Sequence, residues 1–142
     1  MGPIATPEKR PRVPDPRILV VDDTPEIAEL LTFALRERGF DVVASAYDTG
    51  INELIAEHHA DAVVLDCSVF EMSESLFDTV RGDEGSGALP VVIISDTPEK
   101  ADASLRARAA EHVLLIPKPF TGSQVARALN QLIADCGLRI AD

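Results

Sequence analysis

Five short apolar runs alternate along the chain with segments of helical periodicity. The runs lie at about 18–21, 41–45, 61–65, 91–94 and 113–116, and the helical segments at about 25–38, 49–58, 73–81, 98–110 and 121–136. Short apolar runs of this kind are typical of buried parallel strands, and helical segments between such strands cover the faces of their sheet. The alternation therefore predicts an α/β domain with a parallel five-stranded sheet covered by helices on both faces.

Two of the helical segments carry specific expectations. The first begins after Thr24, a potential N-cap, with Pro25 at its first position. Its apolar residues recur at helical spacing and predict a face packed on the sheet: Ile27, Leu30, Leu31, Ala34 and Leu35. The fourth is rich in alanine and has Leu105 as its one large apolar residue, so we expect it to be loosely held.

The ends of the chain differ from its centre. Residues 1–16 hold five of the 10 prolines, which predicts an extended N-terminal arm, either a docking arm or a solubilising tail. Residues 17–136 are expected to form one domain, and residues 137–142 a short C-terminal tail. The length of 142 residues suits a single domain.

Charge and cysteine content exclude several classes of function. The chain has 24 Asp and Glu residues against 13 Lys and Arg residues, a net charge of −11, which disfavours binding to nucleic acid or to a membrane surface. It shows neither an apolar run of the roughly 20 residues that a membrane span needs nor a secretory signal. Cys67 and Cys136 form no CxxC motif, so we expect neither a zinc site nor a disulfide framework, and we expect a cytoplasmic protein.

Polar residues lie within two positions of the ends of four of the five predicted strands: Asp22 and Asp23, Asp66, Ser95, and Lys118. The carboxyl ends of parallel strands meet at one edge of a sheet, where ligands bind. Three neighbouring carboxylates repel one another unless a cation joins them, and oxygen ligands favour Mg²⁺. A magnesium ion beside an ammonium and a hydroxyl group suits phosphoryl transfer.

The motifs LVVDD, VVLD, VVIIS and PKPF occur in this order between residues 19 and 120. In order and spacing they resemble the receiver domains of two-component response regulators over about residues 17–136. The resemblance implies a flavodoxin-like fold of five β–α units, a three-layer sandwich with strand order 2-1-3-4-5. It also implies a phosphoryl group accepted from a histidine kinase or a histidine phosphotransfer protein.

The resemblance further implies a role for each of these residues. Asp66 would be the phosphoacceptor. Asp22, Asp23, Asp66 and the backbone carbonyl of Ser68 would bind Mg²⁺, while Ser95 and Lys118 would contact phosphoryl oxygens. A cis peptide would precede Pro119. The alanine-rich fourth helix, the fifth strand and the last helix would form the face that changes on phosphorylation.

Taken singly, each of these residues has a plainer interpretation. Asp22 and Asp23 could be an acidic helix start, Asp66 a turn residue, Ser95 an N-cap and Lys118 a surface lysine. Their occurrence together in this order favours a site. The pair His58 and His59 suits the end of a helix better than a metal site, and Cys67 suits a buried position better than a redox sensor.

Three features depart from the pattern of the family. Residues 67–74 read CSVFEMSE, which predicts a different loop path beside the site and added negative charge from Glu71 and Glu74. Asp96 follows Ser95, where the family prefers a very small residue, and could hinder phosphorylation or shield the phosphate. Leu115 stands where many members carry an aromatic residue that moves on activation.

Three functions remain open at this point. The favoured one is a stand-alone Mg²⁺-dependent receiver without an output domain, which signals through an unidentified downstream protein or relays its phosphoryl group. A homodimer is compatible with this function. The first alternative is a degenerate receiver that acts as an interaction module without phosphorylation. The second is a small Mg²⁺-dependent phosphohydrolase; apart from the receiver's own phosphorylation and dephosphorylation, we expect no enzyme activity.

Overall fold

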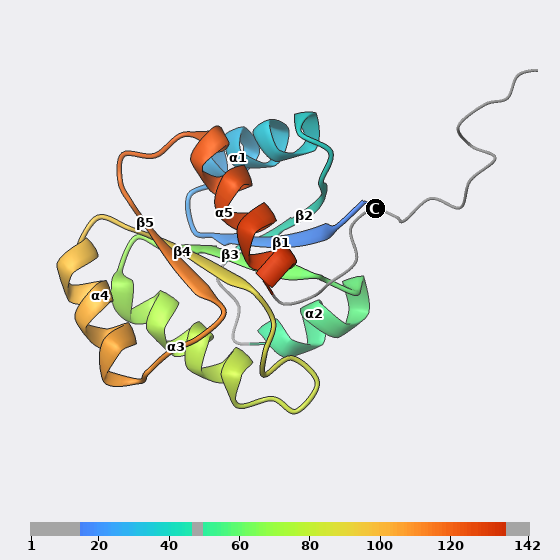
Figure 1. The fold of residues 1–142 in the computed structure, drawn as a ribbon. Helices are drawn as coiled ribbons and strands as arrows, with labels where there is room; N and C mark the ends of the chain where they lie inside the picture. The colour runs from blue at the N-terminus through green and yellow to red at the C-terminus, as the bar shows by residue number, and fades with distance from the viewer. Residues whose placement is uncertain (1–14, 47–49, 136–142) are drawn as a thin grey trace, which may run out of the picture.

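The computed structural model describes residues 15–46 and 50–135. In this part of the chain, strands and helices alternate as the apolar pattern predicts (Figure 1). The strands are β1 (Arg17–Asp22), β2 (Asp41–Ser45), β3 (Ala62–Asp66), β4 (Val91–Ser95) and β5 (Val113–Pro117). The helices are α1 (Pro25–Glu37), α2 (Ile51–His58), α3 (Phe70–Arg81), α4 (Pro98–Ala107) and α5 (Gly122–Asp135).

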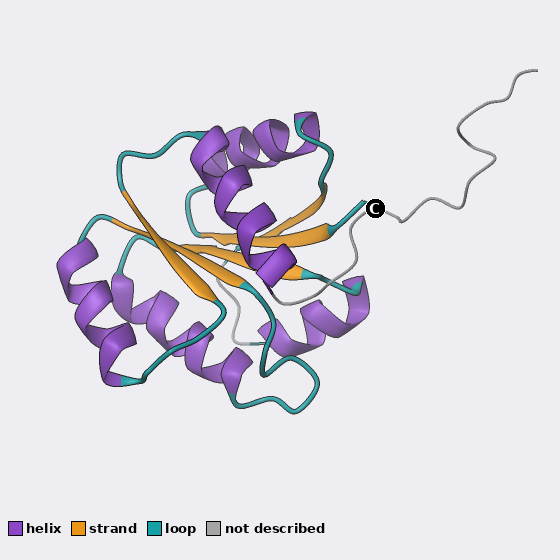
Figure 2. Ribbon diagram, viewed as in Figure 1, coloured by secondary structure: helices purple, strands orange, loops and turns teal. Residues whose placement is uncertain are grey.

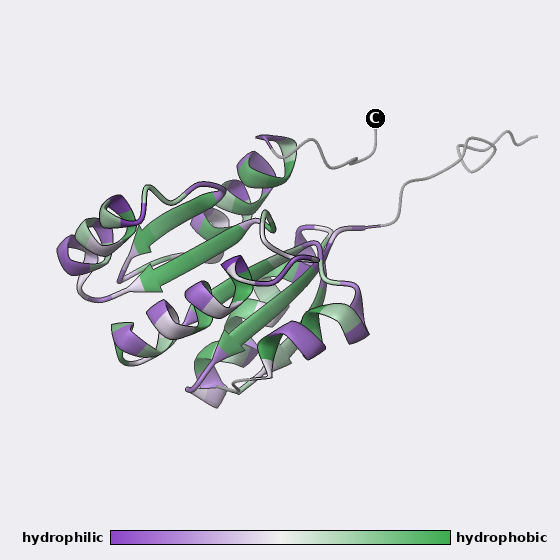
Figure 3. Cartoon of the chain, turned by 90° about the horizontal axis from the view of Figure 1, so that it is seen from below, coloured by the Kyte–Doolittle hydropathy of each residue, from purple (hydrophilic) through white to green (hydrophobic). Residues whose placement is uncertain are grey.

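The five strands form one parallel sheet in the order β2-β1-β3-β4-β5, which confirms the expected topology. Helices α1 and α5 cover one face of the sheet, and α2, α3 and α4 cover the other (Figure 2). Each face has its own apolar core, and the strands contribute to both cores because alternate side chains point to opposite faces. Figure 3 shows the strands as the most hydrophobic layer, between helices whose polar residues face outward.

Helix α1 confirms part of its predicted apolar face and corrects another part. Leu31 and Leu35 are buried in the core, but the Leu30 side chain is 67% exposed. Leu30 is one position removed from Leu31, which turns it by about 100° around the helix axis and away from the sheet. Thr24 occupies the N-cap position as expected, although its side chain makes no capping hydrogen bond.

Helix α3 begins at Phe70, three residues earlier than the periodicity predicts. The Phe70 ring is buried in the core that α2, α3 and α4 share with the sheet, and this burial supports a helical turn directly after the segment that follows β3. Residues 70–74 therefore belong to the first turns of the helix, and the connection from β3 is short.

Helix α5 begins with a reciprocal cap. The Thr121 backbone N–H donates to Gln124 Oε1 at 2.7 Å, and the Gln124 N–H donates to Thr121 Oγ1 at 3.1 Å. This is the capping box that threonine followed three residues later by glutamine can form. It sets the start of α5 close to the predicted boundary.

Some expectations concern residues that the structure does not describe. Residues 1–14 of the predicted arm, Cys136 and the tail at 137–142 lie outside the described part. Within the described part, none of the helices combines the length and apolar character needed to cross a bilayer.

Candidate functional site

The sheet brings the predicted site residues to one edge. Asp22 is the last residue of β1 and pairs in register with Asp66, the last residue of β3. Ser95 ends β4, and its carbonyl accepts a hydrogen bond of 2.8 Å from the Lys118 backbone N–H. Side chains far apart in the chain therefore meet because each follows, or ends, a neighbouring parallel strand.

Asp22 and Asp66 form a buried pair of carboxyl groups, with exposed fractions of 4% and 2%. Asp22 Oδ1 accepts a hydrogen bond of 2.8 Å from the Thr24 backbone N–H. Burial raises the pKa of Asp22 to about 7, and the negative charge of Asp66 contributes to the rise. In the absence of a cation, this carboxyl group holds its proton up to neutral pH.

Lys118 supplies positive charge to this pair. Its ammonium nitrogen lies 3.0 Å from Asp66 Oδ1, and the lysine side chain is 30% exposed. Burial disfavours the charged ammonium, but contact with the Asp66 carboxylate outweighs burial and raises the pKa of Lys118 above its usual value. The peptide bond between Lys118 and Pro119 is cis, as the family resemblance implied.

Asp23 is held differently from Asp22. Its Oδ1 accepts a hydrogen bond of 3.0 Å from the Ser68 backbone N–H, and its Oδ2 accepts another from the Ser68 hydroxyl. Burial acts to raise the pKa of Asp23, but these hydrogen bonds prevail and lower it below its usual value. Asp23 therefore carries its negative charge at neutral pH, at the outer side of the buried pair.

The Ser95 hydroxyl is buried and already oriented. It accepts a hydrogen bond of 2.9 Å from the Thr97 backbone N–H and lies 3.2 Å from the Thr97 hydroxyl. Thr97, rather than Ser95, is the N-cap of α4. Asp96 is exposed beside them, and its negative charge adds to the rise in the pKa of Lys118.

The donor set fits a magnesium ion. Asp22 Oδ2 and Asp66 Oδ2 are buried, and within the described residues neither has a hydrogen-bond donor. Two unpartnered carboxylate oxygens with a third carboxylate nearby are the hard oxygen donors that Mg²⁺ prefers, with water completing its shell. In residues 15–46 and 50–135 no group of three or more His, Cys, Asp or Glu side chains is already arranged to hold a metal ion, so the ion would be held by few side chains and largely by water. The Asp23 carboxylate is instead bound to Ser68.

Cys67 plays a structural part beside this site. Its side chain is only 4% exposed, and burial raises the pKa of the thiol to about 11. A thiol with so little thiolate at neutral pH is a poor nucleophile, which agrees with the expected buried role. His58 is the last residue of α2 and His59 its C-cap, so the pair lies at a helix end as expected, and His59 adopts a left-handed conformation there.

The contacts of Glu71 and Glu74 correct one expectation. These carboxylates were expected to add negative charge to the site, but they face helix α4 instead. Glu71 pairs with Lys100, and Glu74 accepts a hydrogen bond of 2.6 Å from the Ser104 hydroxyl. Their charge is therefore largely matched by partners on α4.

Arg108 completes a polar ladder between α3 and α4. Its guanidinium binds both carboxylate oxygens of Asp78, at 2.8 and 2.9 Å, and lies 3.3 Å from Glu74. We use the name α3–α4 ladder for the six side chains Glu71, Glu74, Asp78, Lys100, Ser104 and Arg108. Helix α4 buries only Ala101 completely, and the ladder adds polar contacts with α3 to this sparse apolar packing. The sequence analysis did not predict the ladder. Its signal was present, because the acids of α3 recur at helical spacing and so do their partners on α4.

The model of the response regulator receiver domain family matches residues 18–130, which include the whole site. The chain belongs to the receiver domain family. It is 33% identical over 105 residues to the transcriptional regulatory protein KdpE of Mycobacterium tuberculosis, a match that covers 72% of this chain and 44% of KdpE. It is 32% identical over 119 residues to the DNA-binding response regulator MtrA of Mycolicibacterium smegmatis, covering 82% of this chain and 50% of MtrA.

Known structures agree with the fold of this receiver. The receiver domain of the sensor histidine kinase PA1611 from Pseudomonas aeruginosa, solved with a magnesium ion in its active-site cleft, superposes with a TM-score of 0.69. It shares 23% identity, and the match covers 84% of this chain and 98% of that one. The chain spans about half the length of the curated relatives it matches.

Proposed function

We propose that this receiver accepts a phosphoryl group on Asp66 from a histidine kinase or a histidine phosphotransfer protein. The observation that carries the proposal is the environment of Asp66. Its buried carboxylate has Oδ1 beside the Lys118 ammonium and Oδ2 without a hydrogen-bond donor among the described residues. An oxygen held in place but not engaged is available as a nucleophile.

The transfer step conserves atoms and charge. An oxygen of the Asp66 carboxylate forms a bond to phosphorus as the bond between phosphorus and the donor's histidine nitrogen breaks, and that nitrogen keeps the electron pair. The product is an acyl phosphate on Asp66. Under this proposal Lys118, now beside Asp66, would neutralise charge on the phosphoryl oxygens, and the Ser95 hydroxyl would donate a hydrogen bond to one of them.

Mg²⁺ is the cofactor that we propose for this step. When bound, it would offset the negative charge of the carboxylates and of the incoming phosphoryl group. Asp22, Asp23 and Asp66 would hold it, together with the backbone carbonyl of Ser68. Burial and the neighbouring charge of Asp66 raise the pKa of Asp22, and a bound cation would offset both effects by favouring the ionised carboxylate.

The output of the receiver is also part of the proposal. We propose that it signals in the cytoplasm as a stand-alone domain through contact with a downstream protein, and that a homodimer is compatible with this role. KdpE and MtrA are named as transcriptional and DNA-binding regulators, and this chain matches about half of each. The charge of −11 supports an output other than direct binding to nucleic acid or to a membrane.

An interaction module that is not phosphorylated is the second candidate. Two observations favour it: the exposed carboxylate of Asp96 next to Ser95, and the aliphatic Leu115 at the position where many family members carry an aromatic switch residue. Leu115 is partly buried and packs into the core shared with α4. Under this alternative, the pocket would be a structural remnant and Asp66 would stay unmodified.

Intact mass separates these functions. The protein is incubated with a small phosphodonor and Mg²⁺, in parallel with the Asp66→Asn variant and with a sample that contains a chelator. We expect the wild type alone to gain the mass of one phosphoryl group, and only with Mg²⁺. No gain, combined with no Mg²⁺-dependent shift in melting temperature, would favour the interaction module. Steady consumption of the donor without an adduct would favour a phosphohydrolase.

A further inference from the structure

Both oxygens of the Asp23 carboxylate are engaged by one neighbour, Ser68. The Ser68 backbone N–H donates to Asp23 Oδ1 at 3.0 Å and to Oδ2 at 3.2 Å, and the Ser68 hydroxyl also donates to Oδ2. Each carboxylate oxygen offers about two lone-pair positions to donors or cations. Both positions of Asp23 Oδ2 are therefore engaged, whereas Oδ1 keeps one position open.

The other two carboxyl groups of the site are held differently. Asp22 Oδ2 and Asp66 Oδ2 have no hydrogen-bond donor among residues 15–46 and 50–135. Of the three expected metal ligands, Asp23 is the one that has to give up hydrogen bonds before Oδ2 binds a cation. The hydroxyl of Ser68 is thus the side-chain group that stands between Asp23 and an ion.

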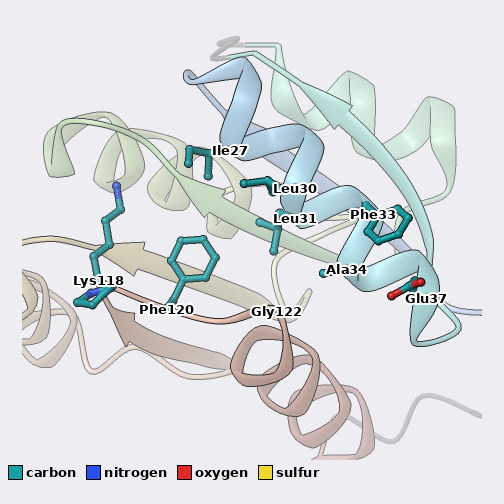
Figure 4. Close-up of a pocket in the computed structure, with 10 residues that line it drawn as sticks. Ile27, Leu30, Leu31, Phe33, Ala34, Glu37, Lys118, Phe120 and Gly122 are labelled. Carbon is teal, nitrogen blue, oxygen red and sulfur yellow. The ribbon is translucent and has the colours of Figure 1, made fainter.

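Within the described part of the chain, no lysine or arginine forms an ion pair with Asp23. Lys118 is the cation of the site. It lies on the segment that leads from β5 to α5, beside an apolar groove of about 770 Å³ between this segment and α1 (Figure 4). The Lys118 ammonium pairs with Asp66, so Ser68 supplies the contacts that orient the Asp23 carboxylate.

The backbone of Ser68 is held in place from both sides. Cys67, directly before it, is buried, and so is Phe70, the first residue of α3. The Ser68 side chain itself is exposed. The backbone N–H is therefore a fixed donor, while the hydroxyl group has room to rotate toward water and to release Asp23 Oδ2.

We propose that the Ser68 hydroxyl competes with Mg²⁺ for Asp23 and raises the Mg²⁺ concentration at which the site fills. This role rests on the proposed function, because it takes Asp23 to be a ligand of the ion. The hydroxyl proton and the cation would bind the same oxygen, so the positive end of the O–H dipole would face the positive ion. Rotation of the hydroxyl toward water removes this conflict, and no covalent bond breaks.

Ser68 therefore has two opposed roles in the proposed site. Its backbone carbonyl is an expected ligand of Mg²⁺, whereas its hydroxyl group keeps Asp23 from the ion. Ser68 is a positioning residue in this account, because its hydroxyl acts on the metal through Asp23. Substitution by alanine separates the two roles, since it removes the hydroxyl and leaves the carbonyl and the N–H.

Magnesium titrations without a phosphodonor test the proposal. The amide NMR signals of residues 22–24 and 66–68 are followed as Mg²⁺ is added to the wild type, Ser68→Ala and Ser68→Thr. We expect Ser68→Ala to bind Mg²⁺ about three- to tenfold more tightly than the wild type, because it loses a hydrogen bond to a charged group that is exposed to water. Ser68→Thr keeps a hydroxyl group and should bind as the wild type does. Ser75→Ala, at an exposed position of α3, is the matched control and should also leave the affinity unchanged.

Two results would overturn the proposal and leave the proposed function standing. The first is an unchanged or weaker affinity in Ser68→Ala, since a weaker one would mean that the hydroxyl helps to place Asp23 for the ion. The second is an equal gain in Ser68→Ala and Ser68→Thr, because loss of the hydroxyl would then not be the cause. A different result, no Mg²⁺ binding by either the wild type or Ser68→Ala, would overturn this proposal together with the magnesium dependence of the proposed function.

Discussion

The ammonium of Lys118 lies 3.0 Å from the Oδ1 atom of Asp66, although the two residues belong to strand ends separated by β4 in the sheet. The contact places a cation against a carboxyl group that is almost completely buried. The other carboxyl oxygen, Asp66 Oδ2, has no hydrogen-bond donor in the described part of the chain. The expected chemistry of this domain depends on that arrangement.

Replacement of Lys118 by methionine is expected to slow phosphorylation from a small donor by about 10²-fold. The reason is that the variant keeps the length of the side chain and removes the charge that stabilises the phosphoryl oxygens. The measurement is the initial rate of adduct formation by mass spectrometry. Lys100→Met, which removes the other lysine of the described residues, is the control and should leave the rate unchanged. Equal rates for both variants would remove Lys118 from the mechanism.

The pKa of Asp22 predicts how the metal-free protein responds to pH. Because the folded state holds a proton up to about pH 7 that the unfolded state releases near pH 4, folding is favoured at low pH. This stabilisation is lost as pH rises through 7, with an upper limit of about 4 kcal/mol. In urea unfolding with a chelator present, we expect the free energy of unfolding to be lower at pH 8 than at pH 5.5. The Asp22→Asn variant is the reference, because its pH dependence reports the contribution of all other titrating groups.

The same substitution tests the role of this carboxyl group at a single pH. At pH 8 without metal, Asp22→Asn should raise the free energy of unfolding by about 1–3 kcal/mol, because it removes a poorly solvated charge. It should also weaken the stabilisation that Mg²⁺ gives the wild type. Glu53→Gln, at an exposed position of α2, is the control for loss of a negative charge. A destabilised Asp22→Asn protein at pH 8 would contradict this assignment.

The α3–α4 ladder predicts that ion pairs with α3 contribute to the attachment of α4. Arg108→Ala removes the two bonds to Asp78 and the contact with Glu74, and should destabilise the domain by about 1 kcal/mol. Arg106→Ala is the matched control, because Arg106 pairs with Asp102 inside α4 and does not reach α3. Hydrogen exchange of α4 amides should accelerate in the first variant alone, and more at low salt than at high salt.

Gly122 tests the contact between α1 and α5. Gly122→Ala would place its methyl group 2.5 Å from the Ala34 Cβ and should cost about 1–3 kcal/mol of stability. Adding Ala34→Gly should recover part of this loss, although glycine inside a helix costs about 1 kcal/mol by itself. Thermal or urea unfolding of the four proteins measures the coupling. Additive effects of the two substitutions would show that these positions do not touch.

Much of the fold follows from local pattern. The five strands and five helices appear in the predicted order because the apolar runs and their punctuation by proline and glycine are local signals. The residues brought together at the sheet edge could also be predicted, because parallel topology places every strand's carboxyl end there. The strand boundaries alone were enough to place four residues at this edge: Asp22, Asp66, Ser95 and Lys118.

Other features could not be found in this way. The exposure of Leu30 depends on the exact rotation of α1 against the sheet, and the apolar groove depends on how closely α5 approaches α1 at Gly122. The sequence led us to expect the charge of Glu71 and Glu74 at the site, whereas both side chains contact α4. That contact depends on how α3 packs against α4 and is not visible in the local sequence. Each of these features arises from the packing of one helix against another, which periodicity within a single segment does not encode.

The most direct test of the account is the position of the phosphoryl group. The protein is phosphorylated with a small donor and Mg²⁺, the acyl phosphate is reduced with borohydride, and the modified residue is located by tandem mass spectrometry. The account predicts that Asp66, out of 24 acidic residues, is the one converted to homoserine, and that Asp66→Asn yields no converted residue. Conversion at another carboxylate, or none in the wild type under conditions where Mg²⁺ binds, would contradict it.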